Sequence, residues 1–298
     1  MRLSMKKIKL KPYVIKVKGA RNYALYDLLN GNFYTVEPEG NVEHLKRSLK
    51  EAGLTFETEG TVPYKINIDL TIEKNSILIR ELQIRLNGCR CNNCWDRKKK
   101  NSDMRFISEE TLQHLKEGTE FIPIVKIRIE ADTEEYGKIC YILSEYHFKE
   151  VELFVEQGIR SENLEDYKKI CTAQDSAFKI LENGKRNILE LNVDIYRFFY
   201  NQHFNACLGQ QIAIDCGGEI KTCLWSNNIL GTICKDNLKD LIVLGIFDEY
   251  WELTKDKIDV CRDCEFRYVC SDCRVNDDDS ITKKPGFCDY DPYNKCLK

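Results

Sequence analysis

The sequence predicts an α/β protein: a partial (β/α) barrel, with a small N-terminal α+β unit before it and a cysteine-rich domain after it. Three observations predict this fold class. Strand-like and helix-like segments alternate between residues 76 and 200, a hairpin signal and a helical segment precede them, and ten of the fifteen cysteines lie from residue 207 onward. Strands that alternate with helices through short connections favour a largely parallel sheet. The expected segments are therefore 1–75, 76–200 and 201–298.

Length and composition are those of an ordinary globular protein with two or three domains. The chain has 298 residues, 43% hydrophobic and 31% charged, and its formal net charge is -3 at pH 7. That charge gives no electrostatic case for a nucleic-acid partner. The N-terminus lacks the apolar stretch of a signal peptide, and no apolar window is long enough for a membrane span. We therefore expect a cytoplasmic protein with reduced thiols, in which clustered cysteines of odd number point to metal rather than to disulfides.

Residues 1–75 show the pattern of a hairpin followed by a helix. Tyr13–Val17 alternates as a strand does, and Asn30-Gly31 separates two further strand-like runs at residues that tolerate positive φ. A helix capped by Asn41 is expected to end at Gly53. Such a unit has an exposed edge strand, which is able to capture a peptide by strand addition. A docking subdomain without that role fits the same residues.

Residues 76–200 contain about four strand-and-helix pairs, too few for a closed eight-stranded barrel. The expected strands are Ser76–Arg80, Gln83–Leu86, Phe121–Ile129, Val151–Val155 and Ile188–Val193. The expected helices are Ser108–Lys116, Glu134–Tyr146 and Leu164–Ala173. An open or partial barrel follows from this count.

Three cysteines come directly after the expected strand Gln83–Leu86. The carboxyl end of a strand is where parallel α/β folds place their active sites. Cys89, Cys91 and Cys94 are therefore candidate catalytic ligands of a metal cluster. One zinc ion or a non-catalytic cluster held by three thiols and one other ligand fits the same residues, as does a site that uses only Cys91 and Cys94.

From residue 201 the sequence predicts a second hairpin and then a helix. The hairpin joins Gln210–Asp215 to Glu219–Cys223 through Gly217-Gly218, and a helix is expected over Lys235–Phe247. Folding back the hairpin is expected to bring Cys207 close to Cys223.

Four cysteines in thirteen residues dominate the next segment, with the spacing Cys261-x2-Cys264-x5-Cys270-x2-Cys273, and Cys288 follows an acidic loop. Zinc ribbons separate two such pairs by about 15–20 residues, so this spacing crowds the pairs for one zinc without excluding it. Iron–sulfur clusters often take three thiolates from a tight run and a fourth from elsewhere, which fits Cys261, Cys264 and Cys270 with Cys288. Cys273 is then available to join Cys207 and Cys223 at a second cluster. The spacing favours iron–sulfur, with zinc as the alternative.

This order of cysteines, with Gly218-x4-Cys223 in the hairpin, resembles the SPASM domain. That domain ends radical S-adenosylmethionine (SAM) enzymes that modify ribosomally made peptides. The stretch from Trp251 to Arg274, the later Cys288-Asp-Tyr-Asp-Pro-Tyr and the early Val17-Lys-Gly-Ala look similar to the peptide maturase of "grasp-with-spasm" systems. In those systems a SPASM protein works beside an ATP-grasp ligase and a small precursor peptide. The resemblance is specific over residues 203–293 and loose over 1–200.

The resemblance implies two auxiliary 4Fe–4S clusters. One would be held by Cys261, Cys264, Cys270 and Cys288. The other would be held by Cys207, Cys223 and Cys273, with a fourth site that is open or filled by Cys216 or Cys234. Cys216 has the better case because it lies in the same hairpin.

Two features depart from the radical SAM pattern. The family motif is Cys-x3-Cys-x2-Cys, whereas this chain has Cys89-x1-Cys91-x2-Cys94. The family's Gly-Gly-Glu, which usually holds the SAM amine, is absent, and the corresponding stretch is Glu130-Ala-Asp-Thr-Glu-Glu135. These departures leave open whether SAM is bound at all.

Three hypotheses follow. The first is a radical SAM-like peptide maturase that acts beside an ATP-grasp ligase, provided that Cys89, Cys91 and Cys94 bind a cluster and SAM. The second is a non-catalytic adaptor that binds the precursor peptide and uses its clusters or zinc only to stabilise its fold. The third is a zinc protein unrelated to peptide maturation.

Overall fold

The computed structural model describes residues 7–38, 42–58, 66–68, 70, 77–89, 104–181, 189–274, 281–286, 288–294 and 296–297. The chain forms two compact units. Unit 1 consists of Met1–Lys74, Asn187–Cys207 and Leu253–Lys298, and unit 2 consists of Asn75–Arg186 and Leu208–Glu252. Both ends of the chain therefore belong to one unit. The segments 1–75, 76–200 and 201–298 stay a prediction, because a compact unit and a sequence segment need not coincide.

Unit 2 is built on a seven-stranded sheet in the order β11-β10-β9-β6-β13-β14-β15. Its strands are β6 (Ile79–Arg85), β9 (Ile124–Ala131), β10 (Glu150–Val155), β11 (Ala177–Ile180), β13 (Gln211–Ile214), β14 (Glu219–Lys221) and β15 (Gly231–Thr232). The first five strands of that order run parallel to one another. β14 pairs antiparallel with β13, and β15 pairs antiparallel with β14.

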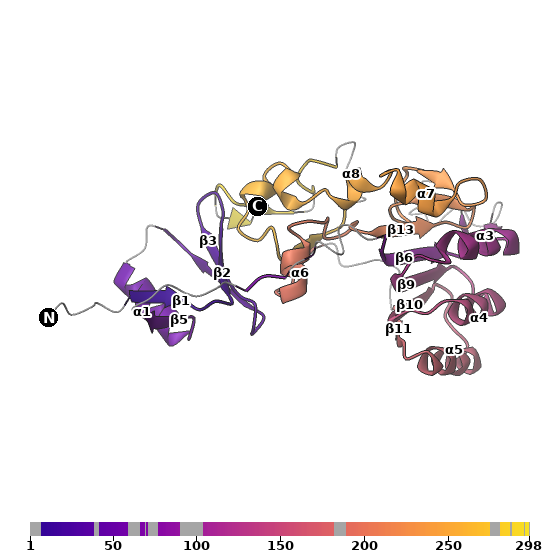
Figure 1. Ribbon diagram of the computed structural model, residues 1–298, viewed down its shortest axis with the longest axis horizontal. Coiled ribbons are helices and arrows are strands. Elements are labelled where there is room, and N and C mark those ends of the chain that lie inside the picture. The colour runs from indigo at the N-terminus through magenta and orange to yellow at the C-terminus, as the bar shows by residue number, and fades with distance from the viewer. Residues whose placement is uncertain are drawn as a thin grey trace. The chain divides into compact units, whose positions relative to one another are not determined.

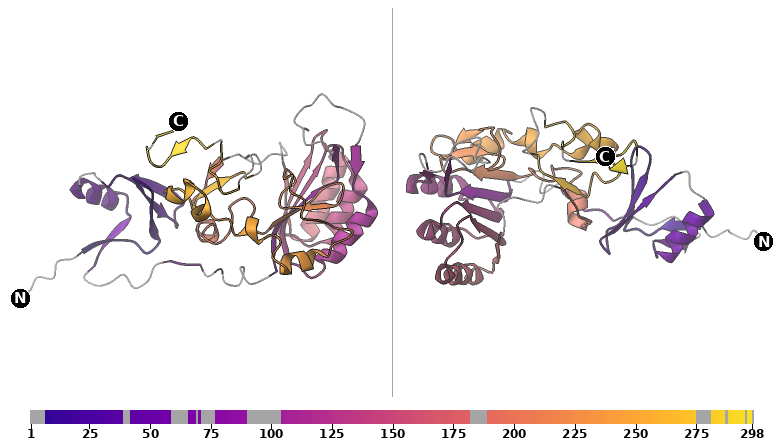
Figure 2. Two further views of the ribbon diagram at one scale, coloured as in Figure 1. Left: turned by 90° about the horizontal axis from the view of Figure 1, so that it is seen from above. Right: turned by 180° about the vertical axis from the view of Figure 1, so that it is seen from behind.

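Three helices of unit 2 lie on one face of this sheet, as Figure 1 and the two further views in Figure 2 show. They are α3 (Glu109–Thr119), α4 (Tyr136–Glu145) and α5 (Ser161–Ala173). The predicted alternation of strands and helices around a largely parallel sheet is confirmed. The curvature of a partial barrel and the SPASM domain stay predictions.

The prediction for the last strand of the parallel sheet is wrong. The sequence places it at Ile188–Val193, but β12 (Leu189–Leu191) pairs with β16 (Cys270–Asp272) of unit 1. β11 takes the position beside β10 instead. It follows α5 through a turn in which Asp175 adopts a φ of 56°, so it completes the crossover through the shortest connection. Its four residues are mostly exposed, which makes its pattern weak in the sequence.

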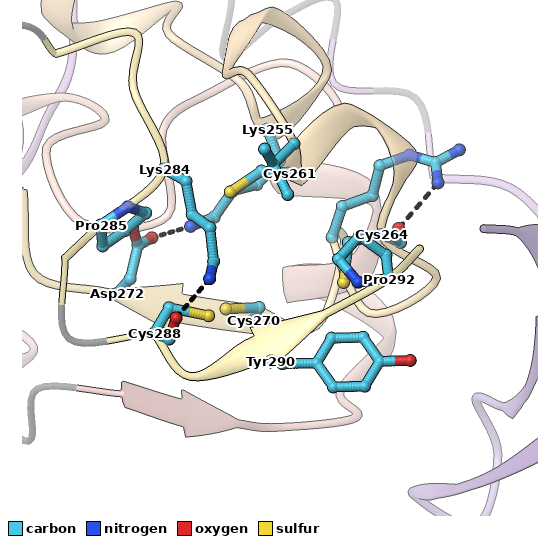
Figure 3. A pocket seen from close by; sticks show the side chains of 12 residues that line it. Lys255, Cys261, Cys264, Cys270, Asp272, Lys284, Pro285, Cys288, Tyr290 and Pro292 are labelled. Carbon is cyan, nitrogen blue, oxygen red and sulfur yellow. Dashed lines mark hydrogen bonds and ion pairs between the residues drawn. The ribbon is translucent and has the colours of Figure 1, made fainter. Parts of the chain in front are cut away.

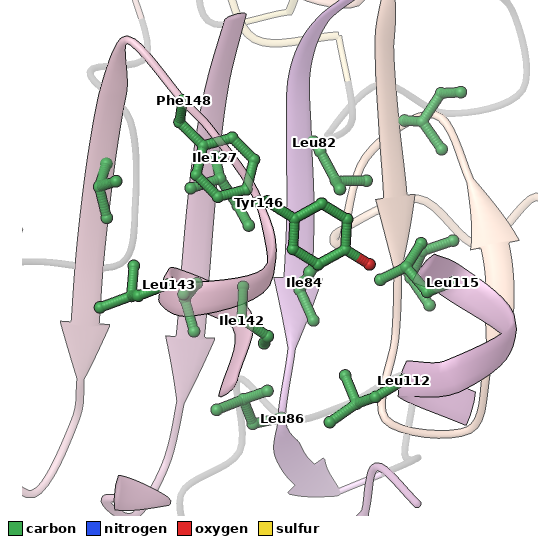
Figure 4. Packing of buried hydrophobic residues seen from close by; sticks show 14 of the residues in the cluster. Leu82, Ile84, Leu86, Leu112, Leu115, Ile127, Ile142, Leu143, Tyr146 and Phe148 are labelled. Carbon is green, nitrogen blue, oxygen red and sulfur yellow. The ribbon is translucent and has the colours of Figure 1, made fainter. Parts of the chain in front are cut away.

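The core of unit 2 lies between the sheet and its helices. Leu82 and Ile84 of β6 and Ile127 of β9 pack against Leu115 of α3 and Ile142 of α4 (Figure 4). All five side chains are 0% exposed. Because alternate residues of a strand face opposite sides, the intervening positions of these strands face away from the helices.

That opposite face of the sheet carries buried charge. Arg128 of β9 donates to Glu152 of β10 through Nε at 2.9 Å and through Nη2 at 2.6 Å, and Lys126 also pairs with Glu152. On β6, the side-chain amide of Gln83 donates to Glu81 at 2.8 Å. These contacts offset the desolvation that makes unpaired buried charges unfavourable.

Unit 1 contains the antiparallel sheet β2-β3-β4 and a second sheet of two strands, β1 and β5. The elements are β1 (Lys7–Leu10), β2 (Val14–Lys18), β3 (Tyr23–Asp27), β4 (Asn32–Val36), α1 (Val42–Glu51) and β5 (Thr55–Thr58). The β3–β4 hairpin turns at Gly31 with a φ of 71°, and Gly53 after α1 has a φ of 69°. Such values favour glycine. The expected hairpin and helix are confirmed, and the expected cap, Asn41, lies outside the described residues.

The sheet β2-β3-β4 packs against the cysteine-rich segment. The hydroxyl of Tyr26 on β3 donates to the carbonyl oxygen of Glu265 at 2.5 Å, and the N–H of Ala20 donates to the carbonyl oxygen of Asp263 at 2.7 Å. Tyr26 is fully buried beside Phe198 of α6 (Ile195–Tyr200), with 5.4 Å between the ring centroids. The N-terminal strands and the cysteine-rich segment thus share one core.

The remaining elements are short. They are β7 (Asn87–Cys89), β8 (Met104–Phe106), α7 (Leu238–Val243), α8 (Asp248–Trp251), β17 (Tyr290–Asp291), β18 (Cys296–Leu297) and the 3-10 turns η1 (Lys255–Lys257) and η2 (Cys261–Asp263). The second hairpin is confirmed as β13 and β14, with Gly218 at a φ of 76°. The helix expected over Lys235–Phe247 is shorter, because Gly245 adopts a φ of 72° just beyond α7. Within the described ranges no helix is both long and apolar enough to cross a bilayer.

Candidate metal centre and peptide groove

Four cysteines line one pocket in unit 1. Cys261 begins η2, Cys264 follows it, Cys270 begins β16, and Cys288 lies in the loop before β17. Their side chains surround this pocket, with Tyr290 beside them (Figure 3). These are the four residues that the sequence groups as one ligand set. The fold therefore brings that set to one pocket from the segment 261–270 and from the loop before β17.

The backbone holds the first two of these cysteines in a tight turn. Val260 has a φ of 66°, which is rare for a β-branched residue, so the chain reverses just before Cys261. The N–H of Cys264 donates to the carbonyl oxygen of Cys261 at 3.0 Å. The N–H of Phe266 points at the sulfur of Cys264 at 3.4 Å. A backbone donor aimed at sulfur stabilises the thiolate form that metals bind.

Burial favours the protonated form of three of these cysteines in the absence of metal. It raises the pKa of Cys264 and of Cys270 to about 12, and it also raises the pKa of Cys261. The ammonium of Lys255 lowers the pKa of Cys261 and Cys270 without offsetting the burial. Metal binding at this pocket therefore has to release protons, because the ligand is the thiolate.

Charged side chains surround the same pocket. Lys255 forms an ion pair with Asp272, and Nη1 of Arg274 lies 3.0 Å from the other oxygen of that carboxylate. The exposed fractions are 4% for Lys255, 3% for Asp272 and 4% for Arg274. Lys284 and Arg267 also line the pocket, and Nζ of Lys284 donates to the carbonyl oxygen of Cys288.

The second predicted ligand set is divided between the units. Cys207 and Cys273 belong to unit 1, whereas Cys216 and Cys223 belong to unit 2. Cys207, Cys216 and Cys223 are buried, and Cys234, the other candidate, is exposed. No disulfide joins any of the eleven cysteines whose side chains the structure describes. The assembly of this set stays a prediction.

The third predicted set lies outside the described residues at Cys91 and Cys94, as does the side chain of Cys89 at the end of β7. The neighbouring turn after β9 is described. Oδ1 of Asn87 accepts the N–H of Asp132 at 2.7 Å, and Nδ2 of Asn87 donates to Oγ1 of Thr133 at 2.7 Å. Asn87 thus occupies the polar groups of the turn where the resemblance places Gly-Gly-Glu.

A groove of about 340 Å³ lies beside β2 in unit 1. Lys16 and Lys18 of β2 form one side of it, and Phe198 and Tyr268 contribute aromatic surface. Arg267 also lines the groove, and no described residue of its lining is a carboxylate. The groove therefore combines positive charge with apolar surface.

Arg267 connects this groove to the four-cysteine pocket, since it lines both. Its Nη1 donates to the carbonyl oxygen of Lys18 at 2.8 Å and to that of Cys264 at 2.9 Å. Its Nε lies 2.9 Å from Oδ1 of Asp256. One guanidinium thus bridges the edge of β2 and the backbone of a predicted metal ligand.

The charged residues around the pocket were missed by sequence reasoning. Lys255 stands in Lys-Asp-Lys, a run that is typical of a solvated surface. Arg267 stands between two aromatic residues and gives no charge pattern. The one available signal was position, because Asp272 lies between Cys270 and Cys273.

Comparison of the chain with models of protein families gives no match, and comparison with curated proteins gives none. Among solved structures, Streptococcus suis SuiB bound to precursor peptide SuiA is similar with a TM-score of 0.29 and 11% sequence identity. The match covers 93% of this chain and 100% of that chain. A TM-score this low carries no argument, so the functional conclusion rests on the residues of this chain.

Proposed function

We propose that this protein takes part in the maturation of a ribosomally made precursor peptide. In this proposal it holds an iron–sulfur cluster at Cys261, Cys264, Cys270 and Cys288 and binds the peptide in the groove beside β2. The observation that carries the proposal is the position of Arg267, which lines both the groove and the four-cysteine pocket. Modification of a bound peptide by a metal–sulfur protein needs a peptide-binding site close to the metal site.

The donor set of the pocket supports an iron–sulfur cluster over one metal ion. In a tetrahedral zinc site all four sulfurs lie about 2.3 Å from one ion. In a 4Fe–4S cluster each thiolate binds a different iron, so the sulfurs lie farther apart. Cys261, Cys264 and Cys270 come from one tight run of the chain, and Cys288 comes from a separate loop. Three thiolates from a tight run with a fourth from elsewhere are a frequent ligand set of iron–sulfur clusters.

The register of β2 supports peptide binding in the groove. Just beyond the strand, the N–H of Gly19 donates to the carbonyl oxygen of Asn22 at 2.8 Å. Hydrogen-bonded and non-hydrogen-bonded positions alternate in an antiparallel pair, so the backbone groups of Lys16 and Lys18 point away from β3. Arg267 occupies the carbonyl of Lys18, but no backbone group of the described chain pairs with Lys16. An extended peptide is able to pair there as an added strand.

Charge narrows the class of peptide. The two lysines of this edge and Arg267 favour an extended segment with carboxylates, and Phe198 and Tyr268 favour an apolar side chain between them. The partner in this proposal is therefore an acidic, partly apolar precursor segment. The ATP-grasp ligase stays a proposal that rests on the sequence resemblance.

A second candidate function, the non-catalytic adaptor, is favoured by Asn87. The Asn87 side chain forms hydrogen bonds with Asp132 and Thr133 in the turn after β9. These hydrogen bonds leave fewer polar groups of the turn available to bind SAM. When bound, a third cluster at Cys89, Cys91 and Cys94 would supply the radical chemistry of the enzyme hypothesis. The adaptor needs only the peptide groove and the metal centre of unit 1.

The first experiment measures iron, sulfide and zinc in the anaerobically purified chain, with EPR spectra in the presence and absence of SAM. About eight irons and no response to SAM would support two auxiliary clusters and the adaptor, and about twelve irons with a response would support the enzyme. Cys264→Ser should remove about four irons, whereas the matched variant Cys140→Ser in α4 should remove none. Zinc without iron would refute the cluster proposal.

The second experiment tests the groove with a fluorescein-labelled peptide of alternating Glu and Val, and with a Lys/Val peptide as its control. Lys16→Ala removes a charge and keeps the backbone donor, whereas Lys16→Pro also removes the N–H that points away from β3. We expect both variants to weaken binding of the acidic peptide, Lys16→Pro more strongly. Equal binding of the two peptides, or unchanged binding by both variants, would refute the groove.

A further inference from the structure

The charge that lines the four-cysteine pocket is predominantly positive. Three basic residues and one carboxylate line it among the described residues: Lys255, Arg267, Lys284 and Asp272. The guanidinium of Arg267 is already paired with Asp256, so the two lysines supply the remaining positive charge of this lining. Four thiolates carry more negative charge than an iron–sulfur core neutralises, so the assembled centre is an anion. The lining therefore has the sign that complements such a centre.

Lys255 is the most deeply placed of these cations. It is 4% exposed, and its ammonium interacts electrostatically with Cys261 and Cys270 as well as with Asp272. Asp272 is shared, because Arg274 contacts its second oxygen at 3.0 Å. One carboxylate thus serves two buried cations. A buried ammonium is unfavourable without opposite charge close by, and the sulfurs are the other groups of the pocket that supply it.

We propose that Lys255 sets the charge balance of the four-cysteine centre. Its ammonium favours an anionic metal–thiolate occupant and favours the more reduced state of that occupant. The inference rests on the proposed function, since it needs a metal at this pocket, and it assigns to Lys255 a positioning and tuning role rather than a catalytic one. Addition of one electron makes the centre more negative, so a nearby positive charge stabilises the reduced form more than the oxidised form.

Lys255→Met tests this role without leaving an orphan charge. Methionine fills a similar volume, and Asp272 keeps Arg274 as its partner. Lys255→Arg keeps the positive charge. Lys257→Met is the matched control, because Lys257 lies in the same turn η1 and is exposed. Asp272→Asn changes the charge in the opposite direction and therefore gives a second, independent variant.

The measurement uses the full chain, reconstituted anaerobically with iron and sulfide. Iron retention is followed during challenge with a ferrous chelator, and the reduction midpoint is followed by EPR in a dithionite titration. The signal that disappears in Cys264→Ala identifies the centre of this pocket. We expect Lys255→Met to hold metal about 10- to 100-fold more weakly and to shift the midpoint to a more negative potential. Lys255→Arg and Lys257→Met should resemble the wild type, and Asp272→Asn should shift the midpoint to a more positive potential.

Two results would overturn the inference while leaving the proposed function intact. One is a midpoint in Lys255→Met that equals that of Lys257→Met, and the other is a shift of the same sign in Lys255→Met and Asp272→Asn. If the wild type holds zinc instead of iron, the cluster proposal fails separately, and chelator competition for zinc decides the role of Lys255. Weaker zinc retention in Lys255→Met than in Lys257→Met would then support the role, and equal retention would refute it.

Discussion

Gly19, just beyond β2, lies against Glu265 of the cysteine-rich segment, so Gly19→Ala tests that packing directly. A Cβ atom at Gly19 would lie 2.5 Å from Oε2, 2.9 Å from the backbone nitrogen and 3.1 Å from Cβ of Glu265. Glu265 is 0% exposed, and Tyr26 and Tyr290 both donate to it. Its backbone would have to move by about 0.5 Å to reach ordinary contact distance, and overpacking of this kind costs about 1–3 kcal/mol. Unit 1 should therefore melt roughly 3–10 °C lower.

The assay separates the two units. All three tryptophans, Trp95, Trp225 and Trp251, belong to unit 2, so their fluorescence reports the unfolding of that unit, whereas calorimetry reports both. Gly19→Ala should lower a calorimetric transition and leave the tryptophan transition unchanged. The control Gly137→Ala, in α4 with no atom within 4 Å of the added Cβ, should instead stabilise unit 2 by about 0.5–1 kcal/mol. If Gly19→Ala melts within about 1 °C of the wild type, the close approach is refuted.

The remaining predictions concern unit 2. Leu115→Ala should lower the free energy of unfolding by about 2–5 kcal/mol, measured by urea unfolding with tryptophan fluorescence, because Leu115 is 0% exposed between α3 and the sheet. Ser108→Ala should cost about 1 kcal/mol in the same assay, because Oγ of Ser108 accepts the N–H of Thr111 at 3.0 Å at the start of α3. A loss below about 0.3 kcal/mol would contradict the cap. Burial alone would raise the pKa of Glu152, but Arg128 and the donors around it hold that pKa below its ordinary value. The stabilisation by Glu152 is therefore complete above the ordinary pKa of glutamate and is lost as the pH falls through the lower, folded value. Glu152→Gln should flatten the dependence of stability on pH in that acid range, and a variant with the wild-type slope would contradict the pairing.

The sequence predicted the longer helices and several strands of the two larger sheets, since local patterns specify them, but it did not predict most of the short elements. Gly31 and Gly53 marked the hairpin and the helix end, and the apolar runs of β9 and β10 identified the parallel sheet. The sequence divided β6 into two strands, Ser76–Arg80 and Gln83–Leu86, whereas the structure has one strand, Ile79–Arg85. The run at Ile188–Val193 was assigned to the wrong partner. The sequence of a short apolar strand does not specify which strand it pairs with. β12 pairs with Cys270–Asp272, far along the chain.

The candidate metal centre was predicted as a ligand set but not as a site. The spacing of Cys261, Cys264 and Cys270 followed from the sequence, and the addition of Cys288 to them is matched by the pocket that all four line. Lys255 and Arg267 could not be predicted, because a lysine or arginine is normally a surface residue. Only the fold shows that Lys255 is buried and that both side chains line the four-cysteine pocket.

The sequence by itself determined the α/β class, because hydrophobic periodicity is a local property of a chain. From ligand spacing it also predicted that Cys261, Cys264, Cys270 and Cys288 form one ligand set. The tertiary structure decided three further matters: that both ends of the chain form one unit, that β2 keeps an edge toward the groove, and that Arg267 joins this edge to Cys264. These are contacts between residues far apart in the sequence. The burial of apolar area and the pairing of buried charge fix such contacts, and both act only once the chain has folded.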